Sequence, residues 1–284
     1  MHAPSKGGEN HSTAHRLSPR AAAYTSRVPR ASTPTSTPRG YHHGNLRHAL
    51  VAQGLELLEE CGLAQFSLRG IAARVGVSHA APKNHFGNLR GLLSAMAAEG
   101  YRLCVVDIRQ RIARAAVAQA HEPESWRQLL ALVCGYVEFA RAHPQLFTLM
   151  YSSQHCNYRQ PDLAEHADEG YRQLRQISAV VLGLPQEPPF NPYTAPNAGA
   201  SALLVQAELL VWVTVHGYAL LMINGMMEPG LGPTARLGPS LGYCPTITEV
   251  AGQLHQQLQQ LGCSAGPSAL TAQALAPAPQ PVRT

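Results

Sequence analysis

Helical spacing of apolar residues is the feature that most limits what this chain can fold into. From Leu46 to Leu261, apolar side chains recur every three or four positions in most segments, without a clear alternation of apolar and polar residues. That spacing places side chains on one face of a helix, whereas a half-buried strand needs a period of two. The sequence therefore predicts an all-α fold, and 45 % hydrophobic residues among 284 can form a sizeable core.

Residues 46–103 contain four predicted helices separated by short breaks. The first ends at Gly62, and Ser67 and Asn88 are suitable N-caps for the second and the fourth. The third is a short helix that we expect to begin at Ser78, directly after a tight turn. This grouping predicts a compact helical domain at the start of the periodic region.

The segment from Ser67 to Phe86 has the form of a helix-turn-helix. In that motif an apolar stripe holds the first helix, a glycine turn sets the angle, and the second helix enters the major groove of DNA. Gly76 supplies the turn here, and the stripe comprises Leu68, Ile71, Ala72 and Val75. We expect the core side of the second helix to comprise Val77, Ala80, Ala81 and Phe86, and its outward side Ser78, His79, Lys83 and Asn84. An ordinary helix pair in a helical core has the same spacing and stays an alternative at this point.

The region Gly40–Arg102 resembles the DNA-binding domain of the tetracycline-repressor (TetR) family. The resemblance is carried by Ser67 and Arg69 before Ile71-Ala72, by Gly76-Val77-Ser78, and by His85-Phe86. It implies a homodimeric, all-helical transcription regulator, most often a repressor that a small ligand releases from its operator. The DNA-binding residues expected on this basis are Arg39, Tyr41, Ser67, Arg69, Ser78, His79, Ala80, Lys83, Asn84, His85, Asn88 and Arg90.

Two positions depart from the family pattern. Lys83 stands where the family usually has a tyrosine that supports DNA contact, and Leu89 stands where a lysine is common, with Arg90 beside it. We expect Lys83 and Arg90 to bind phosphate, the latter together with the helix-start N–H groups near Asn88.

Positive charge is concentrated in the first part of the chain. Residues 1–40 carry six basic side chains against one acidic, a balance of +5, whereas residues 105–284 carry ten against twelve, a balance of −2. This asymmetry suits an anionic partner at one end, and Arg39 is placed to reach a minor groove. Residues 1–40 lack apolar periodicity and should be disordered, or they are partly an over-long reading frame.

The rest of the chain predicts a helical ligand-binding and dimerisation bundle. In residues 201–227, Trp212, His216 and Gly217 resemble the WHG-type C-terminal domain found on some TetR-family proteins. The resemblance implies that this helix and residues 247–261 form a four-helix interface in a homodimer. A membrane span is the alternative for residues 201–227, but polar residues interrupt them and a buried helix is preferred.

A pocket for a small-molecule effector is expected inside this bundle. The mixture of aromatic and polar residues there suits a largely apolar effector with a polar handle. The ligand-binding residues that we expect are Trp126, Phe139, Phe147, Met150, Tyr151, Tyr171, Trp212 and His216.

These inferences divide the chain into four parts. Residues 1–40 are a disordered basic extension, 41–104 a TetR-type helix-turn-helix domain, 105–262 the ligand-binding and dimerisation domain, and 263–284 a disordered tail. The predicted function is a sequence-specific DNA-binding regulator, most simply a repressor, whose operator affinity a small molecule controls.

The main alternative is a soluble enzyme that processes small molecules. The sequence has no HExxH, no GxSxG and no glycine-rich phosphate loop, so we expect no catalytic residues and no cofactor. The pair His42-His43 could suggest a metal, but no matching ligand set is nearby and no metal site is expected. Six cysteines without a CxxC pair, and no secretory signal, predict free thiols and a cytoplasmic protein.

Overall fold

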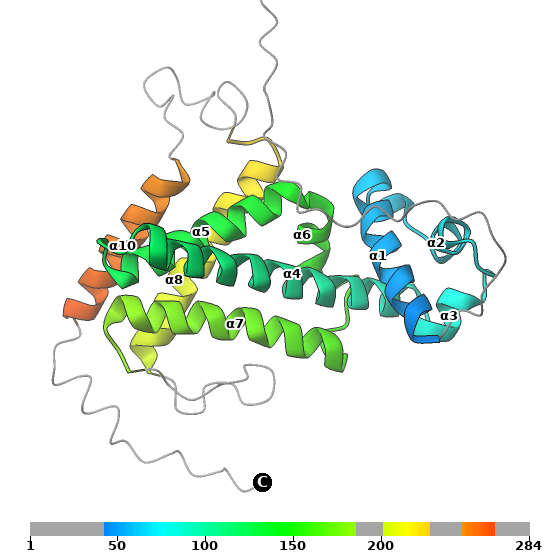
Figure 1. Cartoon of the computed structure of the whole chain (residues 1–284), viewed down its shortest axis with the longest axis horizontal. Coiled ribbons are helices and arrows are strands. Elements are labelled where there is room, and N and C mark those ends of the chain that lie inside the picture. The colour runs from blue at the N-terminus through cyan, green and yellow to red at the C-terminus, as the bar shows by residue number, and fades with distance from the viewer. Residues whose placement is uncertain (1–42, 186–200, 228–245, 265–284) are drawn as a thin grey trace, which may run out of the picture. The chain divides into compact units, whose positions relative to one another are not determined.

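The computed structural model describes residues 43–185, 201–227 and 246–264. Within these ranges the chain forms α-helices and one short 3₁₀-helix, without a strand, which confirms the all-α prediction (Figure 1). The helices are α1 (His43–Cys61), α2 (Leu68–Val75), α3 (Ala81–Phe86), α4 (Leu89–Ala118), α5 (Glu124–Ala142), α6 (Pro144–Met150), α7 (Pro161–Leu182), α8 (Ala202–Ile223) and α10 (Ile247–Ser264). The 3₁₀-helix spans Leu63–Gln65.

Helices α1, α2 and α3 form a small group, here called the head, at the start of α4 (Figure 1). Its helix ends follow the sequence signals. The Ser67 hydroxyl accepts the N–H of Gly70 at 3.1 Å, and the Asn88 side chain accepts the N–H of Gly91 at 2.9 Å. Gly76 ends α2 with φ 75°, a left-handed conformation that favours glycine. Local residue chemistry therefore sets the limits of α2 and the start of α4.

The start of α3 differs from the prediction. Its N-cap is Ala80 rather than Ser78, and Ala80 is exposed rather than on the core side. The Ser78 carbonyl instead accepts the N–H of Ala81 at 3.0 Å, which forms a turn ahead of the helix. Pro82 occupies the first turn of α3, where its fixed φ suits a helix and its missing N–H costs nothing.

The end of α3 and the start of α4 are in close contact. A Cβ atom on Gly91 would lie 2.0 Å from the carbonyl oxygen of Phe86, so only glycine fits there without a shift of the backbone. Phe86 itself is buried beside α1 and α4, and the Arg47 guanidinium lies 5.3 Å above its ring. This packing fixes the orientation of α3.

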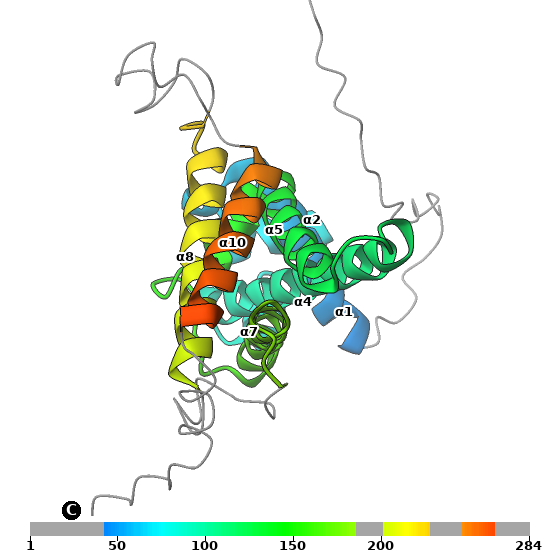
Figure 2. The ribbon, with the colours of Figure 1, turned by 90° about the vertical axis from the view of Figure 1, so that its left-hand side faces the viewer.

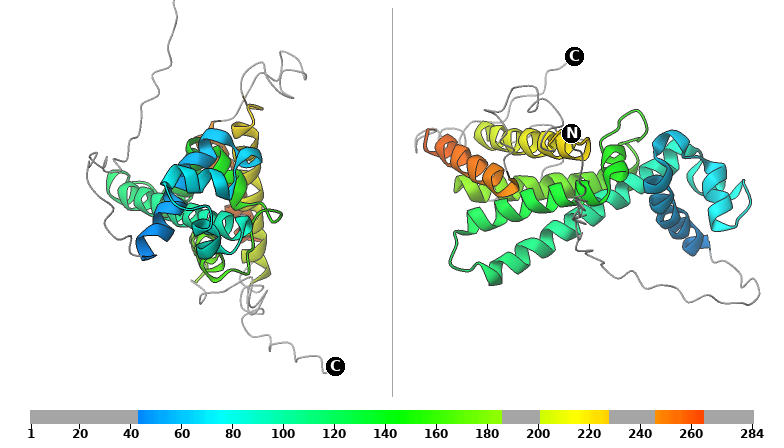
Figure 3. Two further views of the ribbon diagram at one scale, coloured as in Figure 1. Left: turned by 90° about the vertical axis from the view of Figure 1, so that its right-hand side faces the viewer. Right: turned by 90° about the horizontal axis from the view of Figure 1, so that it is seen from above.

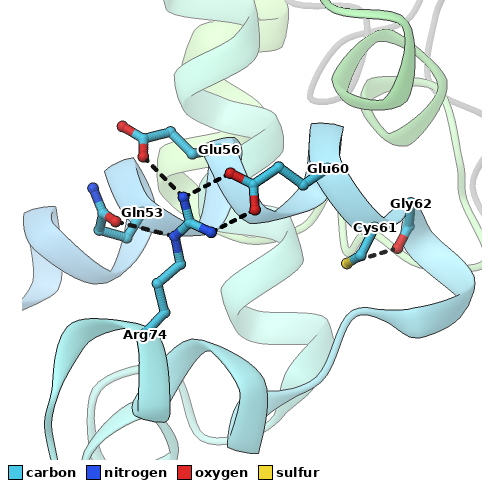
Figure 4. Close-up of polar contacts among 6 residues, drawn as sticks. All are labelled: Gln53, Glu56, Glu60, Cys61, Gly62 and Arg74. Atoms are coloured by element: carbon cyan, nitrogen blue, oxygen red, sulfur yellow. Dashed lines mark hydrogen bonds and ion pairs between the residues drawn. The ribbon is translucent and has the colours of Figure 1, made fainter.

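A surface cluster of polar side chains ties α2 to α1 (Figure 4). The Arg74 guanidinium donates to Glu60 at 2.6 and 2.8 Å, to Glu56 at 3.2 Å, and to Gln53 at 3.1 Å. Hydrogen bonding with Glu60 raises the pKa of Arg74, and the same contact lowers the pKa of the Glu60 carboxyl. The cluster therefore stays ionised near neutral pH.

The remaining helices form the bundle, here α4 through α10. Helices α8 and α10 lie side by side along it (Figure 2), and α4 packs against both α5 and α7. Figure 3 shows that α4 continues from the head into the bundle. Residue 104 is therefore in a helix interior, and the predicted division of the chain there stays a prediction.

Helix α8 is apolar and long enough to cross a membrane, as its sequence suggested, with a mean hydropathy of 1.4. Within the bundle, its buried side chains face neighbouring helices: Leu203, Leu204, Ala207, Glu208, Val211, Val215, Tyr218 and Ala219. One such helix is weak evidence for a membrane span, because core helices of soluble proteins have the same composition.

Candidate DNA-binding face and ligand cavity

Helix α3 presents polar side chains outward from a buried base. Lys83 and Asn84 are exposed, whereas Pro82 and Phe86 are buried. The turn ahead of α3 is also exposed and comprises Ser78, His79 and Ala80. The structure thus brings these predicted residues together on one short segment, which is the arrangement that a DNA-contacting helix needs.

The other predicted DNA-binding residues in the described chain differ in their surroundings. Arg69 is exposed in the first turn of α2, and Ser67 and Asn88 have their side chains engaged as N-caps. The His85 ring is half-buried, with its centroid 6.3 Å from that of Phe86. Arg39 and Tyr41 lie outside the described residues.

Arg90 faces the bundle in this structure. Its guanidinium donates to the carbonyl oxygens of Ser153 at 3.1 Å and Cys156 at 2.9 Å, in the segment between α6 and α7. These bonds tie the guanidinium of Arg90 to the bundle, although the residue remains exposed, and Lys83 is the cationic side chain that α3 itself projects outward.

The bundle contains a partly open cavity of about 420 Å³ between α4, α5, α7 and α8. A volume of this size suits a drug-sized molecule. Three predicted ligand-binding residues line it, namely Tyr151, Tyr171 and Trp212. Its apolar lining includes Val105, Ile108, Leu132, Leu174, Val211 and Val215.

Two further predicted residues pack directly behind the lining. The His216 ring lies 4.5 Å from the Tyr151 ring and stacks on Phe147 at 5.4 Å, and a 2.8 Å hydrogen bond joins His216 Nδ1 to the Tyr136 hydroxyl. Burial lowers the pKa of His216, so its ring is neutral at pH 7. His216 and Phe147 thus hold the cavity's aromatic wall in place.

The other three predicted residues lie outside the cavity lining. Met150 is fully buried and accepts the Tyr101 hydroxyl on its carbonyl at 3.1 Å. The Trp126 ring contacts His255 at 5.7 Å, and the Phe139 ring contacts His143 at 5.0 Å. These side chains pack between helices.

The sequence analysis missed several residues that line the cavity, among them Tyr101, Tyr136, Gln173 and Glu208. Glu208 left a detectable signal, because it is the one acidic residue within the apolar α8 segment. The others carried none, since a tyrosine or glutamine on an amphipathic helix is ordinary.

A polar group of three side chains forms one part of the cavity wall and its support. The Tyr171 hydroxyl donates to Glu208, and Arg175 Nε lies 3.5 Å from the other carboxylate oxygen of Glu208. Arg175 and Glu208 are only 5 % and 2 % exposed. Burial raises the pKa of Tyr171 well above its usual range, so this hydroxyl keeps its proton and remains a donor.

Metal-binding chemistry has no support in the described residues, where no three His, Cys, Asp or Glu side chains gather as ligands. The arrangement offers an outward helix for a polyanion and a partly open, mainly apolar cavity for a small molecule.

Comparisons with known proteins agree with this architecture. Residues 129–237 match the family model described as "Tetracyclin repressor-like, C-terminal domain". That range includes Trp212, His216 and Gly217, the residues that suggested the WHG-type domain. No curated protein matches the chain.

Solved structures resemble this chain to different degrees, and the first two have the same fold. A protein of unknown function from Rhodococcus sp. RHA1 is 26 % identical, with a TM-score of 0.56, and the match covers 78 % of this chain and 98 % of that one. A provisionally named regulatory protein, SCO4313, is 20 % identical with a TM-score of 0.50, covering 79 % and 98 %. A possible TetR family transcriptional regulator from Streptomyces coelicolor A3(2) is 19 % identical with a TM-score of 0.44, covering 77 % and 97 %.

A helix-turn-helix head with its predicted caps therefore precedes a bundle whose sequence matches the tetracycline-repressor C-terminal domain. On this evidence residues 129–237 form a tetracycline-repressor-like C-terminal domain.

Proposed function

We propose that this chain is a TetR-family transcription regulator, that it represses transcription as a cytoplasmic homodimer, and that a small molecule bound in the bundle cavity lowers its affinity for operator DNA. The observation that carries the proposal is the combination of an exposed α3, held on a buried Phe86, with a mainly apolar cavity in the same chain. Neither feature alone distinguishes a regulator from a simple DNA-binding or ligand-binding protein.

Operator contact is proposed for the exposed residues of α3 and its preceding turn. Lys83 is suited to phosphate, and Asn84 can reach phosphate or an adenine edge. Arg39 and Tyr41 are proposed as an arm beside the DNA. In a homodimer, two copies of α3 would occupy major grooves one helical turn apart or a multiple of it, so the operator should be an imperfect palindrome.

Dimerisation is proposed through α8 and the adjacent α10. Four large apolar side chains of α8 are exposed in the single chain: Leu209 at 55 %, Trp212 at 45 %, Val213 at 58 % and Leu221 at 45 %. An obligate interface between two such faces would bury on the order of 2,000 Å² or more. The exposed apolar surface supports a partner helix pair there.

Helix α6 is the proposed connection between cavity and head. Tyr151 lines the cavity directly after the end of α6, and the start of α6 is bound by Glu59 of α1. The Glu59 carboxylate accepts the N–H of Gln145 at 3.2 Å and of Leu146 at 3.0 Å. A ligand that shifts Tyr151 can therefore move α1 through α6. Nearly complete release of DNA needs a difference of roughly 5 kcal/mol in ligand affinity between the two states.

The proposal is tested by selecting bound genomic fragments with the purified full chain and titrating the best fragment with salt. Affinity should fall steeply with salt, because phosphate contacts release counterions. Lys83→Ala should weaken binding about tenfold for every sequence. Arg114→Ala, which removes an exposed positive charge near the far end of α4, is the matched control. Equal binding by the parent and Lys83→Ala would show that α3 is not the contacting helix.

A further inference from the structure

The wall of the cavity is mainly apolar and aromatic and contains one charged side chain. Among the residues that line it, Glu208 is the charged side chain, and none is Lys, Arg or His. Five aromatic side chains contribute ring surface: Tyr101, Tyr136, Tyr151, Tyr171 and Trp212. The wall is therefore aromatic and apolar, with a carboxylate at one place.

Three of the four tyrosine hydroxyls in this wall are already engaged with protein groups. Tyr101 donates to the carbonyl of Met150, Tyr171 donates to Glu208, and Tyr136 shares a hydrogen bond with His216. What these groups can still offer a ligand is mainly oxygen lone pairs and ring faces, because a hydroxyl has one proton but two lone pairs.

Gln173 adds a neutral polar group to the wall. Its side chain lines the cavity and is 5 % exposed. A ligand atom that hydrogen-bonds to this amide gains affinity. The amide can donate to or accept from an uncharged ligand group.

Arg175 balances the charge of Glu208 from outside the cavity lining. Its Nε lies 3.5 Å from Glu208, and both side chains are buried. A cationic ligand would place a second positive charge at this pair, and an anionic ligand would face the carboxylate without a cation in the wall. Burying either unbalanced charge is costly.

We infer that the cavity selects an uncharged, multi-ring molecule bearing a hydroxyl group, that this hydroxyl donates to the Glu208 carboxylate, and that the cavity discriminates against carboxylic acids. The inference rests on the proposed effector role of the cavity and adds the chemical class of the effector. Ring stacking on the tyrosines and Trp212 supplies affinity, and Glu208 supplies selectivity.

Four matched fluorescent probes test the inference on the full chain: 1-hydroxypyrene, pyrene, 1-pyrenecarboxylate and 1-pyrenemethylammonium. Direct fluorescence titration without DNA should give the tightest binding for 1-hydroxypyrene, about tenfold tighter than pyrene, because a hydrogen bond to a charged acceptor adds to the same ring contacts. The carboxylate should bind more weakly than pyrene. Tightest binding of the carboxylate or of the ammonium probe would overturn the inference.

Variants of Glu208 and Arg175 test whether Glu208 causes the preference for 1-hydroxypyrene. Glu208→Gln keeps an acceptor oxygen, so the preference for 1-hydroxypyrene over pyrene should persist while the discrimination against the carboxylate shrinks. The double variant Glu208→Leu with Arg175→Met removes the acceptor without leaving a buried unpaired charge, and the two neutral probes should then bind equally. Circular dichroism checks that each variant folds, and Glu165→Gln on the exposed side of α7 is the matched control.

Two assays separate this inference from the proposed function. If none of the probes binds while operator binding persists, the inference fails and DNA binding stands. If 1-hydroxypyrene binds as expected but leaves operator affinity unchanged, the chemistry of the cavity is supported and its effector role is contradicted.

Discussion

The head and the bundle use their polar side chains in opposite ways. In the head, Arg74 of α2 pairs with Glu56 and Glu60 of α1 at the surface. In the bundle, Arg175 of α7 and Glu208 of α8 are 33 positions apart in the sequence, and both are almost fully buried. Solvent screens the attraction among the surface charges of the head. The buried pair lies in a medium of low dielectric constant, where a charge left without its partner is costly. The head thus carries a solvent-screened ion cluster, whereas the bundle contains a buried ion pair.

The largest expected effect comes from breaking the buried pair on one side. Arg175→Met leaves Glu208 buried without its arginine and should lower the free energy of unfolding by roughly 3–5 kcal/mol. Arg74→Met, the same substitution in the surface cluster, should have a much smaller effect. Urea denaturation of both variants measures the contrast. Similar losses for the two would show that burial does not separate the regions.

A smaller effect is expected where α3 meets α4. Gly91→Ala would place a Cβ atom against the Phe86 carbonyl, so the backbone must shift and stability should fall by about 2 kcal/mol. Because the shift moves α3, operator affinity should fall more than in Gly217→Ala, where a Cβ meets nothing within 4 Å. Thermal denaturation and DNA titration report the two changes. An unchanged operator affinity would mean that α3 tolerates displacement.

The next prediction concerns the hydrogen bonds by which Glu59 of α1 contacts the start of α6. Glu59→Gln weakens the charge-assisted bonds at the start of α6 and should cost about 1 kcal/mol of stability. It should also reduce the effect of a bound ligand on operator affinity. Glu56→Gln, the same change on α1 but facing Arg74, is the control. Ligand response that is intact in Glu59→Gln would exclude this route between cavity and head.

The smallest expected effect is a pH dependence of the bundle. Burial lowers the pKa of His216 and His255 below the unfolded value near 6.5, so the unfolded chain binds protons more readily. Their contribution to stability is therefore complete above about pH 6.5 and is lost as the pH falls through the lowered values. Urea titrations between pH 5 and 8 should show this decline, and His216→Gln should flatten it. A stability that rises on acidification would contradict the assignment.

Much of the fold could be predicted because its signals are local. Helix starts are marked by the capping side chains of Ser67 and Asn88, and the end of α2 is marked by Gly76, which lacks a side chain. The apolar stripes predict the remaining helices. The start of α3 was predicted wrongly: Ser78 belongs to a turn ahead of the helix, its carbonyl accepting the N–H of Ala81, and the helix begins after Ala80 with Pro82 in its first turn.

The sequence by itself determined that this protein is all-helical, where most helices begin and end, and which short segment resembles a DNA-contacting helix. These features follow from interactions within a few residues, such as caps, turns and a period of 3.6. Tertiary structure alone decided that Arg90 faces the bundle and that Tyr136, Gln173 and Glu208 share a cavity. Those positions depend on how helices distant in the chain pack together, and no local pattern encodes that packing.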